Sequence, residues 1–328
     1  MTFHKEILKL DCEKEINQVC SFIKQQTTSM RREGIVLGLS GGIDSALAVE
    51  LCVRALGKDK VLGLLLPEKE SNPVSATYAK KHAKKLGIKA EINDITAVLE
   101  RIGTYKKRDS VIKKIFPDYT SKHGVKITLP SDLLSKDAYN VFTLRINDNK
   151  GKETSFRLDK KTLNGIVAAT DTKQRTRMMH LYYYAEMKNY LVCGTTNKTE
   201  LLQGFFVKYG DGGVDIEPLA HLYKTQVYQL ATYLSVIPEI IERTPSPDTF
   251  SFQVSDEEFY FRIPYNILDP LLYAWENNIK IPEVCEAMGL EEQQVQRAFR
   301  DFTGKHAATK HLRQLPPTLT QEGREEGK

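Results

Sequence analysis

Two hydroxyls, a carboxylate and a pair of glycines stand together in the run Ser40-Gly41-Gly42-Ile43-Asp44-Ser45. Glycine has no Cβ, so the backbone N–H groups of such a turn can approach an anion closely. The run lacks the Gly-Lys-Ser/Thr ending of the Walker loop and the spaced glycines of dinucleotide sites. It therefore predicts a phosphate-binding loop of another kind, with Asp44 as a Mg²⁺ ligand. The alternative is a glycine-rich turn that binds nothing.

The elements that must position this loop can be predicted from apolar spacing. Residues 35–39 form a short apolar run typical of a buried strand. Apolar residues behind the loop recur at helical spacing, at Val49, Cys52, Val53 and Leu56. Further strands are predicted at 61–66, 89–92 and 191–194, and helices at 8–30, at 75–86 and from Thr172 onward. This alternation predicts an α/β fold with a doubly wound, mostly parallel sheet, whose ligands lie beyond the carboxyl ends of the strands.

A second group of chemically capable residues follows the predicted strand at 191–194. Residues 195–200 are polar, and Lys208 and Asp215 bound a glycine-rich run. Polar residues at the carboxyl end of a parallel strand, followed by such a run, indicate a ligand loop. For Lys208 and Asp215 the alternative is simple solvation of a loop.

Residues 101–165 interrupt the alternation and are predicted to be an insert. The first part is basic, either a solvated face or a patch that attracts phosphate groups. Apolar and polar residues then alternate on both sides of the turn-forming segment 147–151, which predicts a β-hairpin. Short helices at 266–276 and 282–302 predict a small C-terminal helical segment. We expect a single domain over 1–317 and a disordered polar tail over 318–328.

Composition excludes several classes of protein. The 328 residues are 41% apolar and 27% charged, and a net charge of +5 gives no separate argument for nucleic-acid binding. A helix-turn-helix reading of 282–302 is disfavoured because Glu291 and Glu292 open its second helix. No apolar run is long enough for a membrane span, and no signal core is visible. The scattered cysteines, three of them in apolar stretches, predict buried free thiols and a cytoplasmic protein.

Taken together, the motifs resemble the NAD synthetase family of the N-type ATP pyrophosphatases. The matching runs stand in the family's order and comprise 40–45, 65–71, 173–179, 194–200, 206–215 and 222–226. The run Lys208-Tyr209-Gly210-Asp211-Gly212-Gly213-Val214-Asp215 is the most specific of them. The resemblance implies an adenine nucleotide α-hydrolase-like fold. It also implies ATP-dependent amidation of nicotinic acid adenine dinucleotide (deamido-NAD) to NAD through an acyl-adenylate.

Site residues follow from the resemblance by matching position. It implies that Asp44, Glu200 and Lys224 are catalytic, with Asp44 and Glu200 on Mg²⁺. It implies an ATP site made of Gly38, Leu39, Ser40, Gly41, Gly42, Ile43, Asp44, Ser45, Thr195, Lys224 and Ser246. It implies deamido-NAD contacts at Arg175, Lys208, Asp215 and His311. The alternatives are a capping role or a surface charge for Lys224, and a surface position for Arg175 and His311.

Departures from the family pattern leave rival interpretations open. Ser246 replaces the usual Thr, Leu312 replaces a usual cation, and the insert lies just before Arg175. An adenylating amide ligase for another carboxylate is therefore one alternative, and an inactive nucleotide-binding regulatory subunit is the second. The length leaves no room for a glutaminase domain, so we expect ammonia, free or from a separate glutaminase, as nitrogen donor. The resemblance also implies a homodimer.

Overall fold

The computed structural model describes residues 3–135, 140–148 and 150–319. Its centre is a four-stranded parallel sheet with the order β3-β2-β1-β7. The strands are β1 (Gly34–Gly38), β2 (Val61–Leu65), β3 (Lys89–Ile92) and β7 (Tyr190–Val192). Apolar runs form β1 and β2 because both faces of a parallel sheet are covered by helices. The predicted α/β fold with a parallel sheet is confirmed.

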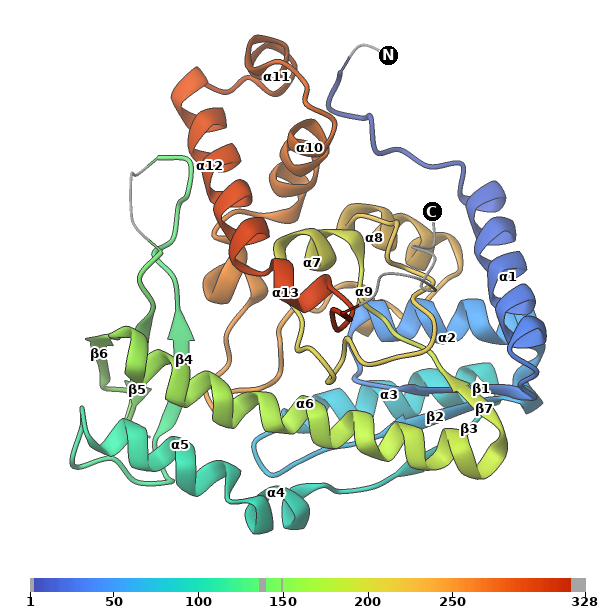
Figure 1. The fold of residues 1–328 in the computed structure, drawn as a ribbon, viewed down its shortest axis with the longest axis horizontal. Coiled ribbons are helices and arrows are strands. Elements are labelled where there is room, and N and C mark those ends of the chain that lie inside the picture. Colours follow the sequence, from blue (N-terminus) through green and yellow to red (C-terminus); the bar gives the residue numbers. More distant parts are fainter. Residues whose placement is uncertain (1–2, 136–139, 149, 320–328) are drawn as a thin grey trace.

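Helices cover both faces of the parallel sheet (Figure 1). Ile35 and Leu37 of β1 face one side, where they pack against α1, α2, α3 and α8. Val36 faces the other side, toward α4, α5 and α6. The helices on the first side are α1 (Cys12–Ser29), α2 (Ile43–Leu56), α3 (Pro73–Leu86) and α8 (Lys224–Tyr233). Those on the second side are α4 (Thr96–Ile102), α5 (Thr104–Lys113) and α6 (Lys160–Lys188).

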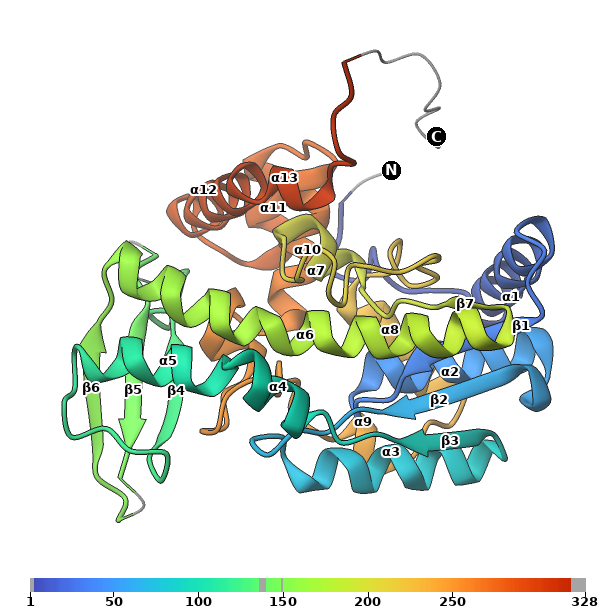
Figure 2. The ribbon, with the colours of Figure 1, turned by 60° about the horizontal axis from the view of Figure 1, so that its bottom comes forward.

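The predicted hairpin is part of a separate three-stranded antiparallel sheet with the order β4-β5-β6. Its strands are β4 (Gly124–Thr128), β5 (Thr143–Asn147) and β6 (Glu153–Arg157). The strand β4 was not predicted, because its pairing with β5 spans a long loop rather than a tight turn. The long helix α6 runs from this sheet to the parallel sheet and joins the two (Figure 2).

The expected start of α6 at Thr172 was wrong. The helix begins at Lys160, where the Asp159 carboxylate caps it by accepting a 2.7 Å hydrogen bond from the Thr162 N–H. Its first turns bury Ile166 against the antiparallel sheet, whereas its later turns face the parallel sheet. The apolar face changes partner along the helix, which hides the helical period in the sequence.

Residues 265–313 form a helical subdomain over the carboxyl edge of the parallel sheet (Figure 1). Before it come α7 (Lys198–Gln203), α9 (Pro238–Ile241) and a π-helical turn (Glu257–Phe261). The subdomain contains α10 (Tyr265–Glu276), α11 (Ile281–Met288), α12 (Glu292–Ala308) and α13 (Lys310–Arg313). Gly289 ends α11 in the left-handed conformation and so separates α11 from α12.

Two further expectations can be compared with the structure, and a third, the disordered tail, falls mostly outside the described residues. All five cysteines are free, and Cys20, Cys52 and Cys193 are buried as predicted. Within the described ranges, no helix is both long and apolar enough to cross a membrane. Residues 320–328 of the predicted tail lie outside the described residues.

Candidate active site

The predicted phosphate loop connects β1 to α2 at the carboxyl edge of the parallel sheet. The Ser40 and Ser45 hydroxyls lie 3.1 Å apart, and the Ser40 Oγ accepts a 3.2 Å hydrogen bond from the Gly42 N–H. Gly41 has a φ of 74°, and a Cβ at this position would lie 2.2 Å from the Ser75 carbonyl oxygen. A larger residue would therefore push the loop away from α3, so the glycine is required for the observed shape.

Asp44, Glu200 and Lys224 converge beside this loop from three helix N-termini. The Lys224 Nζ lies 2.5 Å from the Asp44 Oδ2 and 3.5 Å from the Glu200 Oε1. The Asn197 side-chain amide donates a 2.9 Å hydrogen bond to the Asp44 Oδ1. Glu200 occupies the third position of α7, where it completes a capping box with Asn197. The three residues implied to be catalytic therefore form one contacting group.

Burial and charge both act on this group. Burial would lower the pKa of Lys224, but the Asp44 and Glu200 carboxylates reverse the effect and raise it. Burial raises the pKa of Glu200 well above its usual range, and the nearby charges of Asp44 and Asp256 add to that rise. Three carboxylates thus surround a single ammonium group, and a further cation at this place would relieve their repulsion.

Two buried hydrogen bonds fix the position of Lys224 at the start of α8. The Thr199 hydroxyl accepts a 3.0 Å hydrogen bond from the Lys224 N–H and donates to Asp269 at 2.7 Å. Asp269 also accepts a 2.7 Å bond from the Thr225 N–H. Burial raises the pKa of Asp269 to about 6. This support is absent from the sequence pattern, because Asp269 lies on α10, far along the chain.

A cavity of about 1000 Å³ opens over the loop and collects most of the predicted binding residues. Lining residues implied to bind ATP are Gly38, Leu39, Ser40, Gly42, Ile43, Asp44, Ser45, Thr195, Lys224 and Ser246. Glu200, Arg175, Lys208 and His311 line it as well. Gly41 is buried behind the loop surface against Ser75.

The residues implied to bind deamido-NAD do not all meet. The Arg175 Nε donates to the Lys208 carbonyl at 3.2 Å, and the Lys208 Nζ donates to the His311 carbonyl at 2.7 Å. Asp215, in contrast, is exposed and is not among the residues that line the cavity. Its carboxylate accepts hydrogen bonds from the Tyr182 hydroxyl at 3.0 Å and from the Val192 N–H at 2.7 Å. In this chain Asp215 therefore ties the loop to β7 and α6.

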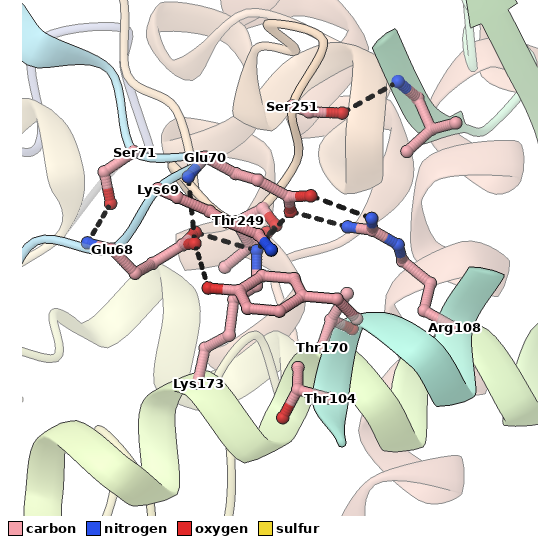
Figure 3. Close-up of polar contacts among 12 residues, drawn as sticks. Glu68, Lys69, Glu70, Ser71, Thr104, Arg108, Thr170, Lys173, Thr249 and Ser251 are labelled. Atoms are coloured by element: carbon pink, nitrogen blue, oxygen red, sulfur yellow. Dashed lines mark hydrogen bonds and ion pairs between the residues drawn. The ribbon is translucent and has the colours of Figure 1, made fainter. Parts of the chain in front are cut away.

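Sequence reasoning missed a buried ion cluster beside the cavity, drawn in Figure 3. Lys173 of α6 is fully buried, and its Nζ lies 2.8 Å from both the Glu68 Oε1 and the Glu70 Oε2. Arg108 of α5 donates two hydrogen bonds to the Glu70 carboxylate, at 2.5 and 2.8 Å. The Tyr105 hydroxyl donates to the Glu68 Oε2 at 2.6 Å.

This ion cluster joins segments that are far apart in the sequence. Glu68 lines the cavity, Lys173 comes from α6, and Arg108 belongs to the segment predicted as an insert. Burial alone would raise the pKa of Glu70, but hydrogen bonds and charges from Arg108 and Lys173 lower it to about 2. No local signal could have revealed these pairs, although Glu68 and Glu70 stand in a run that matches the family motifs.

The fold and the site together define a class. A phosphate loop of the Ser-Gly-Gly-x-Asp-Ser type at the carboxyl edge of a parallel sheet, with two carboxylates and a lysine beside it, is typical of N-type ATP pyrophosphatases. The model of the NAD synthase family matches residues 15–122 and 128–316, and so runs through most of 101–165 as well. The chain belongs to the NAD synthase family, and the expected membership is confirmed.

Individual relatives agree with this assignment. The NH(3)-dependent NAD(+) synthetase of Rhizobium meliloti (strain 1021) is 41% identical over 321 residues, which are 98% of this chain and 96% of the relative. The NH3-dependent NAD synthetase from Campylobacter jejuni has a TM-score of 0.63 and 26% identity, and the match covers 95% of this chain and 100% of that structure. The NMN synthetase from Francisella tularensis shares the fold, with a TM-score of 0.65 at 23% identity over 94% of this chain and 99% of that one.

Proposed function

We propose that the protein converts deamido-NAD to NAD with ATP and ammonia. The observation that carries the proposal is the single cavity in which the phosphate loop, the Asp44–Lys224–Glu200 group and the cations Arg175 and Lys208 all line the walls. The phosphate loop suits the phosphates of ATP, and the cations Arg175 and Lys208 suit the phosphates of a dinucleotide. An in-line transfer between two bound nucleotides requires that their binding sites lie close together, and here both sites line one cavity.

The reaction proceeds in two steps. The nicotinate carboxylate attacks the α-phosphorus of ATP, the bond to the β-phosphate oxygen breaks, and pyrophosphate leaves with the electron pair. Ammonia then attacks the activated carbonyl carbon, AMP leaves, and a proton is lost from nitrogen to give the amide. Lys224 stabilises the phosphate charge that develops in the first step, since it is fixed at its backbone and buried among carboxylates.

We propose Mg²⁺ as the metal, with Asp44 and Glu200 as its protein ligands. The donor set fits, because two partly buried carboxylates, those of Asp44 and Glu200, flank the single buried ammonium group of Lys224. In the part of the chain that the structure describes, no group of three His, Cys, Asp or Glu side chains could hold a metal by itself. Mg²⁺ commonly completes its shell with phosphate oxygens and water. When bound, it would neutralise charge on the phosphates of ATP.

We further propose that the protein is a homodimer that acts in the cytoplasm. Met179, Tyr183 and Met187 form an exposed apolar ridge on α6, at 53%, 63% and 57% exposure, beside the partly buried Met178, Leu181 and Tyr182. A ridge of this kind favours association with a second copy. The five free thiols favour a reducing compartment. A monomeric and fully active enzyme in analytical ultracentrifugation would contradict the dimer.

The test is an assay with ATP, Mg²⁺ and deamido-NAD, in which ammonium and glutamine are supplied separately and NAD, AMP and pyrophosphate are all measured. We expect equal amounts of the three products with ammonium and none with glutamine alone. AMP release with another acceptor, such as nicotinic acid mononucleotide, and no NAD would indicate a different carboxylate substrate. No AMP with any acceptor would indicate the regulatory alternative.

A further inference from the structure

Arg243 is a cation of the cavity wall to which neither the motifs nor the proposed reaction gives a role. It lies just after α9 and is half-buried, and its side chain reaches the phosphate loop. Its NH1 donates to the Gly41 carbonyl at 3.2 Å, and its NH2 donates to the Ser75 hydroxyl at 2.9 Å. The Ser75 hydroxyl in turn donates to the Asp248 carboxylate at 2.9 Å. Arg243 is therefore held against the loop at a defined place.

The positive charge of Arg243 is not consumed by a carboxylate. Over the described residues, its hydrogen-bond partners are the Gly41 carbonyl and the Ser75 hydroxyl, and it makes no ion pair. A guanidinium group has five N–H donors, so donors remain for a ligand in the cavity. Lys224, the other cation at this loop, is already paired with Asp44 and Glu200. Beside the loop, Lys224 is therefore paired with carboxylates, whereas Arg243 has no carboxylate partner among the described residues.

The loop also needs donors from outside itself. Two of its N–H groups, those of Ser40 and Gly42, already bond to the Ser45 and Ser40 hydroxyls at 3.3 and 3.2 Å. A polyphosphate bound there would carry several negative charges close to the Asp44 and Glu200 carboxylates. A planar guanidinium that can bond two phosphate oxygens at once is suited to this charge.

We propose that Arg243 binds the β- and γ-phosphates of ATP and holds the pyrophosphate after the bond to the α-phosphorus has broken. The inference rests on the proposed function for its place in the reaction. The binding of pyrophosphate itself does not require an acyl acceptor. Arg243 donates hydrogen bonds throughout and transfers no proton, and the leaving pyrophosphate carries the electron pair of the broken bond.

The experiment measures direct binding of magnesium pyrophosphate and, separately, of AMP to the full-length protein by titration calorimetry. The variants are Arg243→Gln and Arg243→Lys, and the control is Arg54→Gln, which removes an exposed arginine at the far end of α2. We expect Arg243→Gln to weaken pyrophosphate binding by about tenfold or more, Arg243→Lys to weaken it less, and AMP binding to be unchanged in both. The control should bind both ligands as the wild type does.

Two results would overturn the inference. Unchanged pyrophosphate binding in Arg243→Gln would show that the guanidinium does not contact these phosphates. Equal weakening of AMP and pyrophosphate binding would show that Arg243 only supports the shape of the loop through Gly41 and Ser75. If the protein made no NAD but lost pyrophosphate affinity with Arg243, the proposed function would fail and this inference would stand.

Discussion

Replacing Lys173 with methionine should destabilise the protein strongly. Lys173 and Glu68 have fully buried side chains, and Glu70 is only 13% exposed. Methionine keeps most of the volume but leaves two buried carboxylates without the ammonium group between them. Removal of one partner from a buried ion pair costs about 3–5 kcal/mol, because the remaining charge is uncompensated.

The depressed pKa of Glu70 indicates how strongly its basic neighbours Arg108 and Lys173 stabilise the carboxylate. It lies at about 2 in the folded protein, against an ordinary value of 4.5. A difference of this size corresponds to about 3 kcal/mol of stability, shared between Lys173 and Arg108. Because the pKa is depressed, this contribution is present in full above pH 4.5 and is lost as the pH falls from 4.5 toward 2. Lys173→Met should therefore flatten the acid side of the stability profile.

The assay is urea unfolding followed by circular dichroism at several pH values, with Lys69→Met as the matched control. Lys69 lies between Glu68 and Glu70 in the sequence and pairs with Glu100 at 2.9 Å, but both side chains are about half exposed, at 44% and 54%. This control should lose about 1 kcal/mol or less. The double variant Glu68→Gln/Lys173→Met should lose less than the sum of its two single variants. A loss for Lys173→Met no larger than that for Lys69→Met would refute the reasoning.

Two further predictions concern the site, and a third concerns the carboxyl group of Glu217. Asp44→Asn should lower kcat by about a hundredfold or more, since Lys224 and the proposed metal lose a carboxylate. Steady-state kinetics with and without EDTA check this, and undiminished turnover would contradict it. Arg175→Ala should raise the KM for deamido-NAD by about tenfold. The KM of this variant for ATP should stay unchanged. Equal changes in the KM for ATP and the KM for deamido-NAD would argue against a contact between Arg175 and deamido-NAD. Burial raises the pKa of Glu217 to about 8. Between pH 4.5 and 8 the folded protein therefore keeps a proton on Glu217 that the unfolded chain has lost. Stability falls as the pH rises through that window. Glu217→Gln should remove this fall, and denaturation at pH 5 and pH 8 measures it; an unchanged slope would contradict the assignment.

Features that depend on neighbouring residues could be predicted from the sequence. The strand-to-helix turn at 40–45 combines an apolar run, a glycine pair and a helical period, all within about one βαβ unit. The structure places it between β1 and α2 at the carboxyl edge of the sheet. The group of Asp44, Glu200 and Lys224, which the family resemblance implied, also meets, because each residue stands in the first turn of a helix at that edge.

Features that depend on partners far along the chain could not be predicted from the sequence. The start of α6 was predicted wrongly because the first turns of the helix pack against the antiparallel sheet and the later turns against the parallel sheet. The strand β4 could not be recognised without β5, whose hydrogen bonds satisfy it. Asp215 matches the family motif, yet its side chain bonds to Tyr182 and Val192 outside the cavity.

The sequence by itself therefore determined the type of fold, the phosphate loop and most of the residues around it. The tertiary structure decided which charges are paired and which remain available. Lys173 and Arg243 show the difference, since no nearby residue in the sequence tells which groups lie beside either side chain. One is neutralised by Glu68 and Glu70, and the other lies against backbone and hydroxyl groups. The energy of a charge depends on its burial and on the charges within a few ångströms, and only the folded chain brings those together.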